Sequence, residues 1–235
     1  RTLLRARQET LRRLQEISRR RLAHLVKAAR ELLLMEGDAE LLDSERDSAI
    51  ETVRALDRHH LARVASVHQS YRDRARPAER PALQRTRRQL VDQIGEASAV
   101  LLAGGHVAVL LNRLSLFDVG PLLADKTVIA WSAGAMVASE QVVLFHDRPP
   151  QGPGNAEVLD HGLALCRGVL PLPHARARLD LDDSARVSLL SRRFAELRPM
   201  ALEPGSRIDY QPARLSPRAG AQELCRDGRV EETGA

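Results

Sequence analysis

The sequence predicts an α/β fold in which a parallel sheet follows a long helical region. In residues 1–96 apolar side chains recur at three- and four-residue steps, the period of a helix that buries one face. After residue 96, short continuous apolar runs alternate with helical stretches, and such runs are typical of strands buried on both faces. Alternating strands and helices predict a parallel sheet that binds its ligands at the carboxyl ends of the strands.

The helical region, residues 1–96, divides into two long helices and a shorter third. Leucines recur at multiples of seven residues from Leu4 to Leu32, and Gly37-Asp38 then supplies a helix stop followed by an N-cap. A second apolar stripe runs on to Pro77. Two long helices joined at Gly37 predict a hairpin, and we expect its helices to join copies of the chain into a homo-oligomer.

Residues 97–210 are predicted to form one α/β domain. Its strands are expected at 97–103, 127–131, 141–145, 168–172, 199–202 and 207–210, with helices at 107–117 and 182–197. The proline- and glycine-rich stretch 147–154 is expected to be a loop. Residues 211–235 have the composition of a poorly ordered tail.

The charge of the chain is uneven. Residues 1–96 hold 21 basic and 15 acidic side chains, whereas residues 97–235 hold 15 and 16. Many of the arginines stand beside Glu or Asp at helical spacing, and no aromatic side chains are interleaved with them. A solvated helix face is therefore the favoured interpretation, and a nucleic-acid surface is a less favoured alternative.

Other residue types exclude several classes of protein. Cys166 and Cys225 have neither the spacing of a metal site nor that of a disulfide framework, which fits a reducing, cytoplasmic compartment. No apolar stretch is long enough to span a membrane, and no secretory signal opens the chain. His59 and His60 lack an acidic ligand on the same helix face, so we expect a packed His60 and no metal or cofactor.

The clearest chemical signal follows the strand at 127–131. Trp131-Ser132-Ala133-Gly134-Ala135 places a serine between an apolar strand and a helix that begins with small residues. A nucleophilic serine is exposed on such a turn, where small neighbours avoid steric clashes. The alternative is that Ser132 only caps the helix. Gly104-Gly105 at the end of the preceding strand favours the nucleophile, because glycine lets a second oxyanion donor approach a substrate.

A serine nucleophile needs a base, and the base needs an acid that orients it. His174 follows the strand at 168–172, so we expect it on the same rim of the sheet as Ser132. Asp147 follows the strand at 141–145 and is a candidate for the acid. The other histidines of this half are less well placed: His106, His146 and His161.

These residues resemble the serine peptidases related to aspartyl dipeptidase (dipeptidase E) and cyanophycinase. The resemblance covers roughly residues 97–210. It rests on Gly104-Gly105, Trp131-Ser132-Ala133-Gly134-Ala135-Met136, Asp147-Arg148-Pro149, and Pro173-His174 with Arg176 and Arg178. It implies a fold similar to class I glutamine amidotransferases, with serine in place of their cysteine.

The resemblance also implies the roles of single residues. Ser132 would be the nucleophile and His174 the base, and the N–H groups of Gly105 and Ala133 would bind the oxyanion. Two acids stay open. Asp147 is favoured because it stands fifteen residues after the serine, as in dipeptidase E. Glu203 is the second choice, because cyanophycinase-like members take a glutamate from a similar place.

The expected activity is hydrolysis of a peptide or isopeptide amide through an acyl-enzyme on Ser132. By analogy with the aspartyl preference of relatives, Arg148, Arg176 and Arg178 would bind an acidic side chain of the substrate. The alternative is a non-catalytic relative that binds a ligand or a protein. Ala130 favours this alternative, because the family usually has glycine two residues before the serine.

Overall fold

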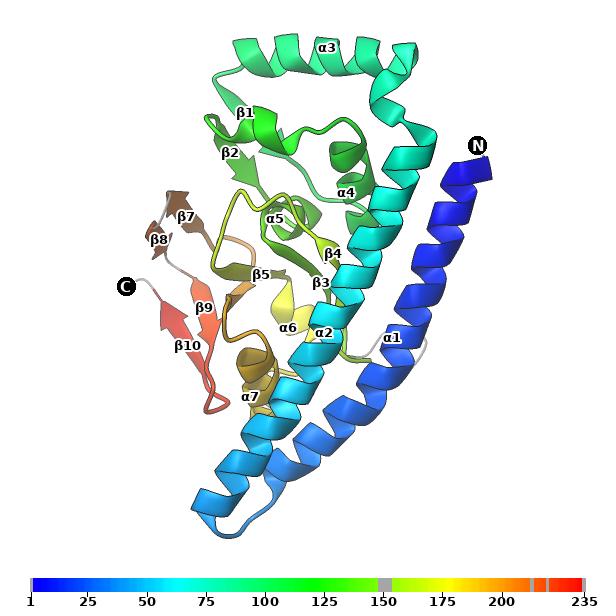
Figure 1. Cartoon of the computed structure of the whole chain (residues 1–235). Helices are drawn as coiled ribbons and strands as arrows, with labels where there is room; N and C mark the ends of the chain where they lie inside the picture. Colours follow the sequence, from blue (N-terminus) through cyan, green and yellow to red (C-terminus); the bar gives the residue numbers. More distant parts are fainter. Residues whose placement is uncertain (1, 148–153, 212–213, 219, 234–235) are drawn as a thin grey trace.

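The helical part of the chain forms the long hairpin that the sequence predicts (Figure 1). The computed structural model describes residues 2–147, 154–211, 214–218 and 220–233. Helices α1 (Thr2–Leu34) and α2 (Ala39–Ala75) are the two arms of the hairpin, and α3 (Pro81–Glu96) follows after a short 3-10 turn at Pro77–Glu79. The predicted turn at Gly37 is confirmed: Asp38 caps α2 by accepting hydrogen bonds from the N–H groups of Glu40 and Leu41.

The hairpin packs on the rest of the protein as well as on itself. Its own core consists of Leu22, Val26, Ala29, Ile50, Val53 and Leu56. Leu189 of α7 (Ser184–Arg193) joins this cluster from the second half of the chain. The helical region therefore shares its core with the α/β part.

A buried ion pair reinforces this contact. Arg193 is 4% exposed, and two of its nitrogens each lie 2.6 Å from a carboxylate oxygen of Asp57 on α2. A third nitrogen donates to the carbonyl of Ala156, also at 2.6 Å. A buried charge is tolerated only when it is paired in this way, so α2, α7 and the segment around Ala156 are held together.

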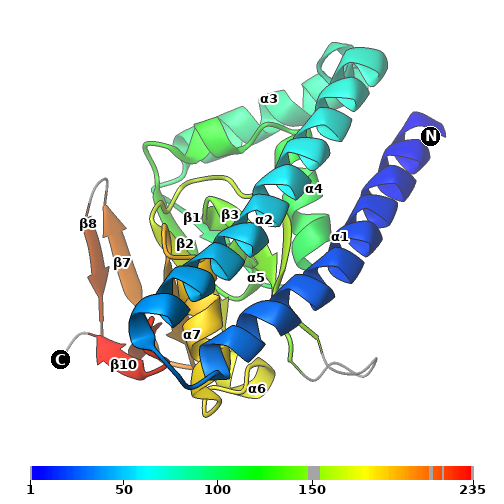
Figure 2. The same ribbon diagram turned by 60° about the horizontal axis from the view of Figure 1, so that its bottom comes forward.

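The second half of the chain alternates short strands and helices, with most of the predicted elements in place. The bounds are β1 (Ala99–Leu102), α4 (Val107–Leu116), η2 (Gly120–Leu123), β2 (Thr127–Ala130), α5 (Ala133–Ala138), β3 (Gln141–Leu144), β4 (Glu157–His161), β5 (Val169–Pro173), α6 (Ala175–Arg178), α7, β6 (Arg198–Leu202), β7 (Ile208–Gln211), β8 (Arg214–Pro217), β9 (Ala221–Leu224) and β10 (Val230–Thr233). In Figure 2, β7 and β8 lie on the opposite side of the body from α1.

The predicted parallel sheet of class I glutamine amidotransferase-like type is wrong. In the described part of the chain, β1 and β2 form a parallel sheet of only two strands. The largest sheet has the order β10-β9-β6-β5, in which β5 and β6 are parallel and the other pairs are antiparallel. β3–β4 and β7–β8 are separate antiparallel pairs.

Two prolines explain why β5 ends its sheet. The N–H of His174 donates to the carbonyl of Leu202 at 2.8 Å, which fixes the edge of β5 that faces β6. Successive N–H groups of a strand point to opposite edges, so positions 171 and 173 face away from β6. Both are prolines, which have no N–H, so Val169 is the one residue of β5 that can donate to a further strand from this edge.

Residues 211–235 were expected to form a poorly ordered tail, but their described part is folded. Its described residues form β8, β9 and β10, and β9 pairs with β6 in the four-stranded sheet. Ala221 is 0% exposed and Leu224 is 2% exposed, because both side chains pack into the body. The α/β part thus extends beyond residue 210 to Thr233.

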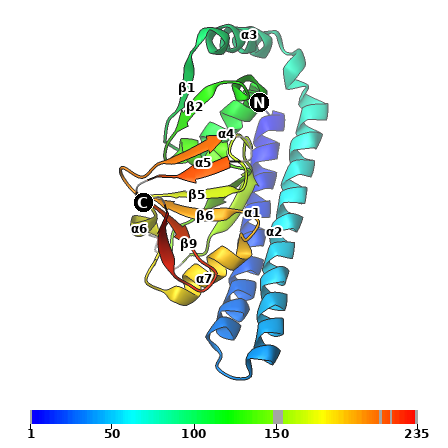
Figure 3. The ribbon, with the colours of Figure 1, turned by 90° about the vertical axis from the view of Figure 1, so that its left-hand side faces the viewer.

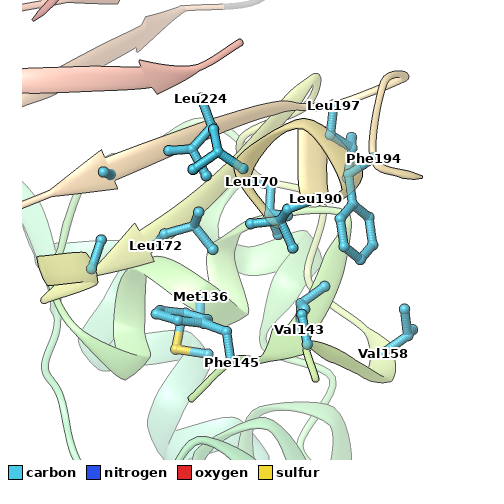
Figure 4. Close-up of a cluster of buried hydrophobic side chains, with 14 of the residues drawn as sticks. Met136, Val143, Phe145, Val158, Leu170, Leu172, Leu190, Phe194, Leu197 and Leu224 are labelled. Atoms are coloured by element: carbon cyan, nitrogen blue, oxygen red, sulfur yellow. The ribbon is translucent and has the colours of Figure 1, made fainter. Parts of the chain in front are cut away.

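The main core lies between α5, α7 and the four-stranded sheet (Figure 4). It is mostly aliphatic, as the scarcity of aromatic residues predicts: Met136, Leu170, Leu172, Leu190 and Leu224 are buried in it. Among the described residues, no helix combines the length and the hydropathy that crossing a membrane would require.

His60 is packed into the protein, as predicted, and it makes stability depend on pH. It is 3% exposed, and its Nε2 has no hydrogen-bond partner. Burial lowers the pKa of His60 below its usual value of 6.5, against the opposing effect of Asp57. The unfolded chain therefore binds the proton more tightly, and we expect the free energy of unfolding to fall as the pH drops below about 6.5.

The substitution His60→Leu should remove part of this pH dependence and raise stability by roughly 1 kcal/mol at neutral pH, because the unpaired nitrogen is lost. Urea unfolding at about pH 7 and pH 5 would measure both effects. His59→Leu, at the exposed neighbouring position, is the control and should leave the pH dependence unchanged. Equal pH dependence in the wild type and in His60→Leu would contradict the prediction.

Candidate active site

Ser132 occupies a sharp turn between β2 and α5. Its backbone has φ +52° and ψ −124°, a conformation that non-glycine residues seldom adopt and that costs about 1–3 kcal/mol. Ser132 directly precedes α5, yet its hydroxyl makes no capping hydrogen bond to that helix. The geometry therefore does not favour the alternative in which this serine is only a helix cap.

Close backbone packing holds this turn. The N–H of Trp131 donates to the carbonyl of Leu102 at 3.1 Å, and the N–H of Gly134 donates to the carbonyl of Trp131 at 2.9 Å. A Cβ atom on Gly134 would lie 1.9 Å from the carbonyl oxygen of Leu102, so only glycine fits there. The first turn of α5 is thus pressed against the end of β1, and the serine stands at the point of closest approach.

Gly104 and Gly105, which follow β1, lie beside the turn that carries Ser132. A Cβ atom on Gly104 would be 2.9 Å from the Cβ and 3.1 Å from the Oγ of Ser132, which puts this glycine against the serine side chain. Gly105 has φ +129°, and no atom lies within 4 Å of where its Cβ would be. The glycine pair therefore borders open space next to the hydroxyl. The oxyanion roles of Gly105 and Ala133 stay predictions.

His174 ends β5 and begins α6. It adopts the left-handed conformation, with φ +57° and ψ +42°, and its side chain is exposed. The next residue, Ala175, is completely buried in the core cluster that also holds Met136, one helical turn after Ser132 in α5. His174 and Ser132 thus lie at the margin of one core. Among the described residues, however, no hydrogen bond connects the Ser132 hydroxyl with the His174 imidazole.

Asp147, the favoured acid, is engaged elsewhere. One carboxylate oxygen accepts from the guanidinium of Arg186 and the other from the N–H of Asp180, both at 2.8 Å. The side chain is 7% exposed and connects the end of β3 with α7 and the segment before it. Asp147 makes no hydrogen bond to His174 within the described ranges. Its surroundings are those of a structural carboxylate.

Glu203, the second choice, lies beside His174. It follows Leu202, whose carbonyl accepts from the backbone N–H of His174. Its Oε1 accepts from the N–H of Arg176 at 2.7 Å, two residues after the histidine. Of the two predicted acids, Glu203 is therefore the one whose backbone adjoins that of His174, although within the described ranges the two side chains share no hydrogen bond.

A turn that the sequence analysis overlooked positions this glutamate. Glu203-Pro204-Gly205-Ser206 forms a tight turn closed by a hydrogen bond from the N–H of Ser206 to the carbonyl of Glu203 at 2.9 Å. Gly205 has φ +90°, as the third residue of such a Pro-Gly turn requires. The Ser206 hydroxyl also accepts from the N–H of Glu203. The Pro-Gly pair was the sequence signal that could have singled out Glu203.

The two arginines proposed for substrate binding have different surroundings. Arg176 is exposed, and among the described residues its guanidinium hydrogen-bonds only to the side-chain oxygen of Gln222, at 3.3 Å. Arg178 lies over the ring of Phe145, with 5.6 Å between the guanidinium carbon and the ring centroid. Arg148 lies outside the described residues. Arg176 is thus the arginine that borders His174 and Glu203 with a free charge.

Other reactive side chains do not form a competing centre. Burial raises the pKa of the Cys166 thiol to about 12, so it is protonated and unreactive at neutral pH. Within the described ranges, no three His, Cys, Asp or Glu side chains are grouped as a metal site would require.

Comparison with known proteins adds no family. A scan against models of protein families finds no match to this sequence, and a search of curated proteins finds none either.

The contact between Gly134 and β1 can be tested by adding a methyl group. Gly134→Ala would push its Cβ into the carbonyl of Leu102, and we expect a loss of about 3 kcal/mol or more in the free energy of unfolding. Gly95→Ala in α3 is the matched control. Nothing lies within 4 Å of its Cβ position, so it should gain about 0.5–1 kcal/mol. Denaturant unfolding of both variants measures the difference, and a neutral Gly134→Ala would contradict this geometry.

Proposed function

We propose that this protein is a serine-type hydrolase of peptide or isopeptide amides that acts through an acyl-enzyme on Ser132. The observation that carries the proposal is the strained backbone of Ser132, with a hydroxyl that does not cap the helix behind it. Backbone strain of this kind clusters at functional sites, where the surrounding structure holds the residue in place. Gly104 packs against the serine side chain, and the open space at Gly105, the next residue, leaves room for the substrate carbonyl.

In this reaction the Oγ of Ser132 attacks the amide carbonyl carbon while the imidazole of His174 takes the hydroxyl proton. The carbonyl oxygen becomes an oxyanion, for which the N–H groups of Gly105 and Ala133 are the donors. The C–N bond then breaks, and His174 passes its proton to the leaving nitrogen. Water hydrolyses the resulting ester by the same two transfers, which restores Ser132 and releases the acid.

Glu203 is the acid that we assign to His174. Its carboxylate accepts from the N–H of Arg176, two residues after the histidine, whereas both oxygens of Asp147 are occupied by Arg186 and by the N–H of Asp180. A carboxylate in this position orients the imidazole and stabilises its protonated form. Arg176 follows His174 by two residues and its backbone N–H donates to Glu203, and its exposed guanidinium favours a substrate with an acidic side chain.

A non-catalytic ligand- or protein-binding module is the second candidate. The specific observation in its favour is that Ser132 and His174 share no hydrogen bond in the described structure. Catalytic hydrogen bonds are often long without substrate, so this observation alone does not outweigh the serine geometry. The two candidates differ in whether the serine is nucleophilic.

A fluorophosphonate probe tests that difference. We expect the folded chain to be labelled, because the probe reacts with a serine whose proton a nearby base can take. Ser132→Ala should abolish labelling, and His174→Gln should slow it by about 100-fold or more. Mass spectrometry of the labelled peptide identifies the serine. Absence of labelling in a sample with an intact circular dichroism spectrum would support the non-catalytic candidate.

The assignment of the acid has its own test. Glu203→Gln should slow labelling by about tenfold or more and leave the melting temperature nearly unchanged, since the side chain is at the surface rim. Asp147→Asn should do the reverse: it breaks a buried ion pair with Arg186 and lowers stability by about 1–3 kcal/mol. The two variants are compared by labelling rate and thermal unfolding. If Asp147→Asn slowed labelling and Glu203→Gln did not, Asp147 would be the acid that orients His174.

A further inference from the structure

The hairpin carries opposite charges at its two ends. Residues 28–50, which we call the acidic tip, hold seven acidic and two basic side chains. Residues 2–21 and 58–76, which we call the basic end, together hold twelve arginines and three acidic side chains. The tip surrounds the turn between α1 and α2, and the basic end is formed by the other halves of both helices. Charge is therefore separated along the length of the molecule.

The dipole of α1 does not account for this separation, although α2, with Glu40 in its first turn and Arg72 and Arg74 in its last, complements its own dipole. α1 has no acidic residue in its first turn and no basic residue in its last, so its charges do not complement the helix dipole. Because the two helices are antiparallel, the arginine-rich half of α1 also lies beside the arginine-rich half of α2, and the acidic parts meet at the turn. Like charges side by side destabilise the isolated hairpin.

The acidic tip also exposes apolar side chains. Leu34, Met35 and Leu41 are 58%, 50% and 65% exposed, although all three lie within eight residues of sequence. Figures 1 and 3 show that the turn carrying them projects beyond α7, away from the body of the protein. Exposed apolar side chains gathered on a projecting element mark an interaction surface.

We propose that two copies of this chain associate with their hairpins antiparallel, so that the acidic tip of each contacts the basic end of the other. The charge complementarity of the two ends favours a second copy as the partner. α2 has 37 residues and is about 55 Å long, which lets both contacts form in one twofold-symmetric interface. Leu34, Met35 and Leu41 are covered in this arrangement.

The charges required for this contact are available. Glu36, Glu40 and Glu45 at the tip are exposed and have no ion pair among the described residues. The basic end has four exposed arginines that likewise form no ion pair within the described ranges: Arg5, Arg21, Arg63 and Arg74. A nucleic acid would bind the arginines but would be repelled by the acidic tip, and it would leave the apolar side chains uncovered. The second copy accounts for both ends.

The first experiment is sedimentation of the full chain in about 50 mM and about 500 mM NaCl, because screening weakens contacts between exposed charges. We expect a dimer at low salt whose dissociation constant rises by about tenfold or more at high salt. A chain that stays monomeric at about 100 µM in low salt overturns the proposal. So does a monomer that shifts duplex DNA in the same buffer.

Reversing charges at the tip and at the basic end tests whether these two surfaces contact each other in the dimer. Glu36→Arg/Glu45→Arg lowers the net charge of the acidic tip from −5 to −1, and Arg63→Glu/Arg74→Glu lowers that of the basic end from +9 to +5. Each variant alone should be monomeric at low salt, because the attraction at both of its contacts is weakened and the substituted positions face like charges. An equal mixture should regain the dimer, because the altered tip meets the altered basic end and the native tip meets the native one.

Asp125→Arg/Glu232→Arg, at exposed positions of the body, is the matched control for the change in net charge and should dimerise like the wild type. Circular dichroism verifies that every variant folds. If both hairpin variants dimerise on their own, the copies meet through another surface and the proposal is overturned. A mixture that stays monomeric has the same consequence.

Discussion

A buried arginine holds the helical hairpin and the stranded body in one arrangement. Arg193 on α7 is paired with Asp57 on α2 and bonded to the carbonyl of Ala156. Removing one partner of such a pair costs about 3–5 kcal/mol, because the other charge stays buried, so these elements must keep their relative positions. α7 also connects α6 with β6 in the chain, and His174 and Glu203 lie at the ends of the strands on either side of it. The arrangement of the candidate base and acid thus depends on a contact with the first half of the chain.

The nucleophile has a different support. Ser132 is placed by the approach of Gly134 to the carbonyl of Leu102, on the two-stranded sheet, whereas His174 belongs to the four-stranded sheet. The contact between the two parts is made by side chains such as Met136 in the shared core. The serine and the histidine are therefore positioned relative to each other by packing and not by one continuous hydrogen-bonded ladder.

Local features were predictable from the sequence. The hairpin turn at Gly37-Asp38 and the turn at Ser132 follow from residue types at adjacent positions, and both are present. The parallel sheet is not predictable from apolar runs, because such a run indicates a buried strand but not its partners, and Pro171 and Pro173 remove two donors from one edge of β5. The choice between acids could not be settled, because Arg186 reaches Asp147 from 39 residues further along the chain. Spacing within a motif says nothing about such distant partners.

The two prolines of β5 also matter before the protein is folded. Val169–Pro173 is a fully buried apolar strand, and a segment of this kind readily pairs with other chains while it is exposed during folding. Proline at two of the three positions on one edge removes most of its hydrogen-bond donors, which disfavours extension into an intermolecular sheet on that side. The feature that limits the sheet in the native protein therefore protects the nascent chain from aggregation.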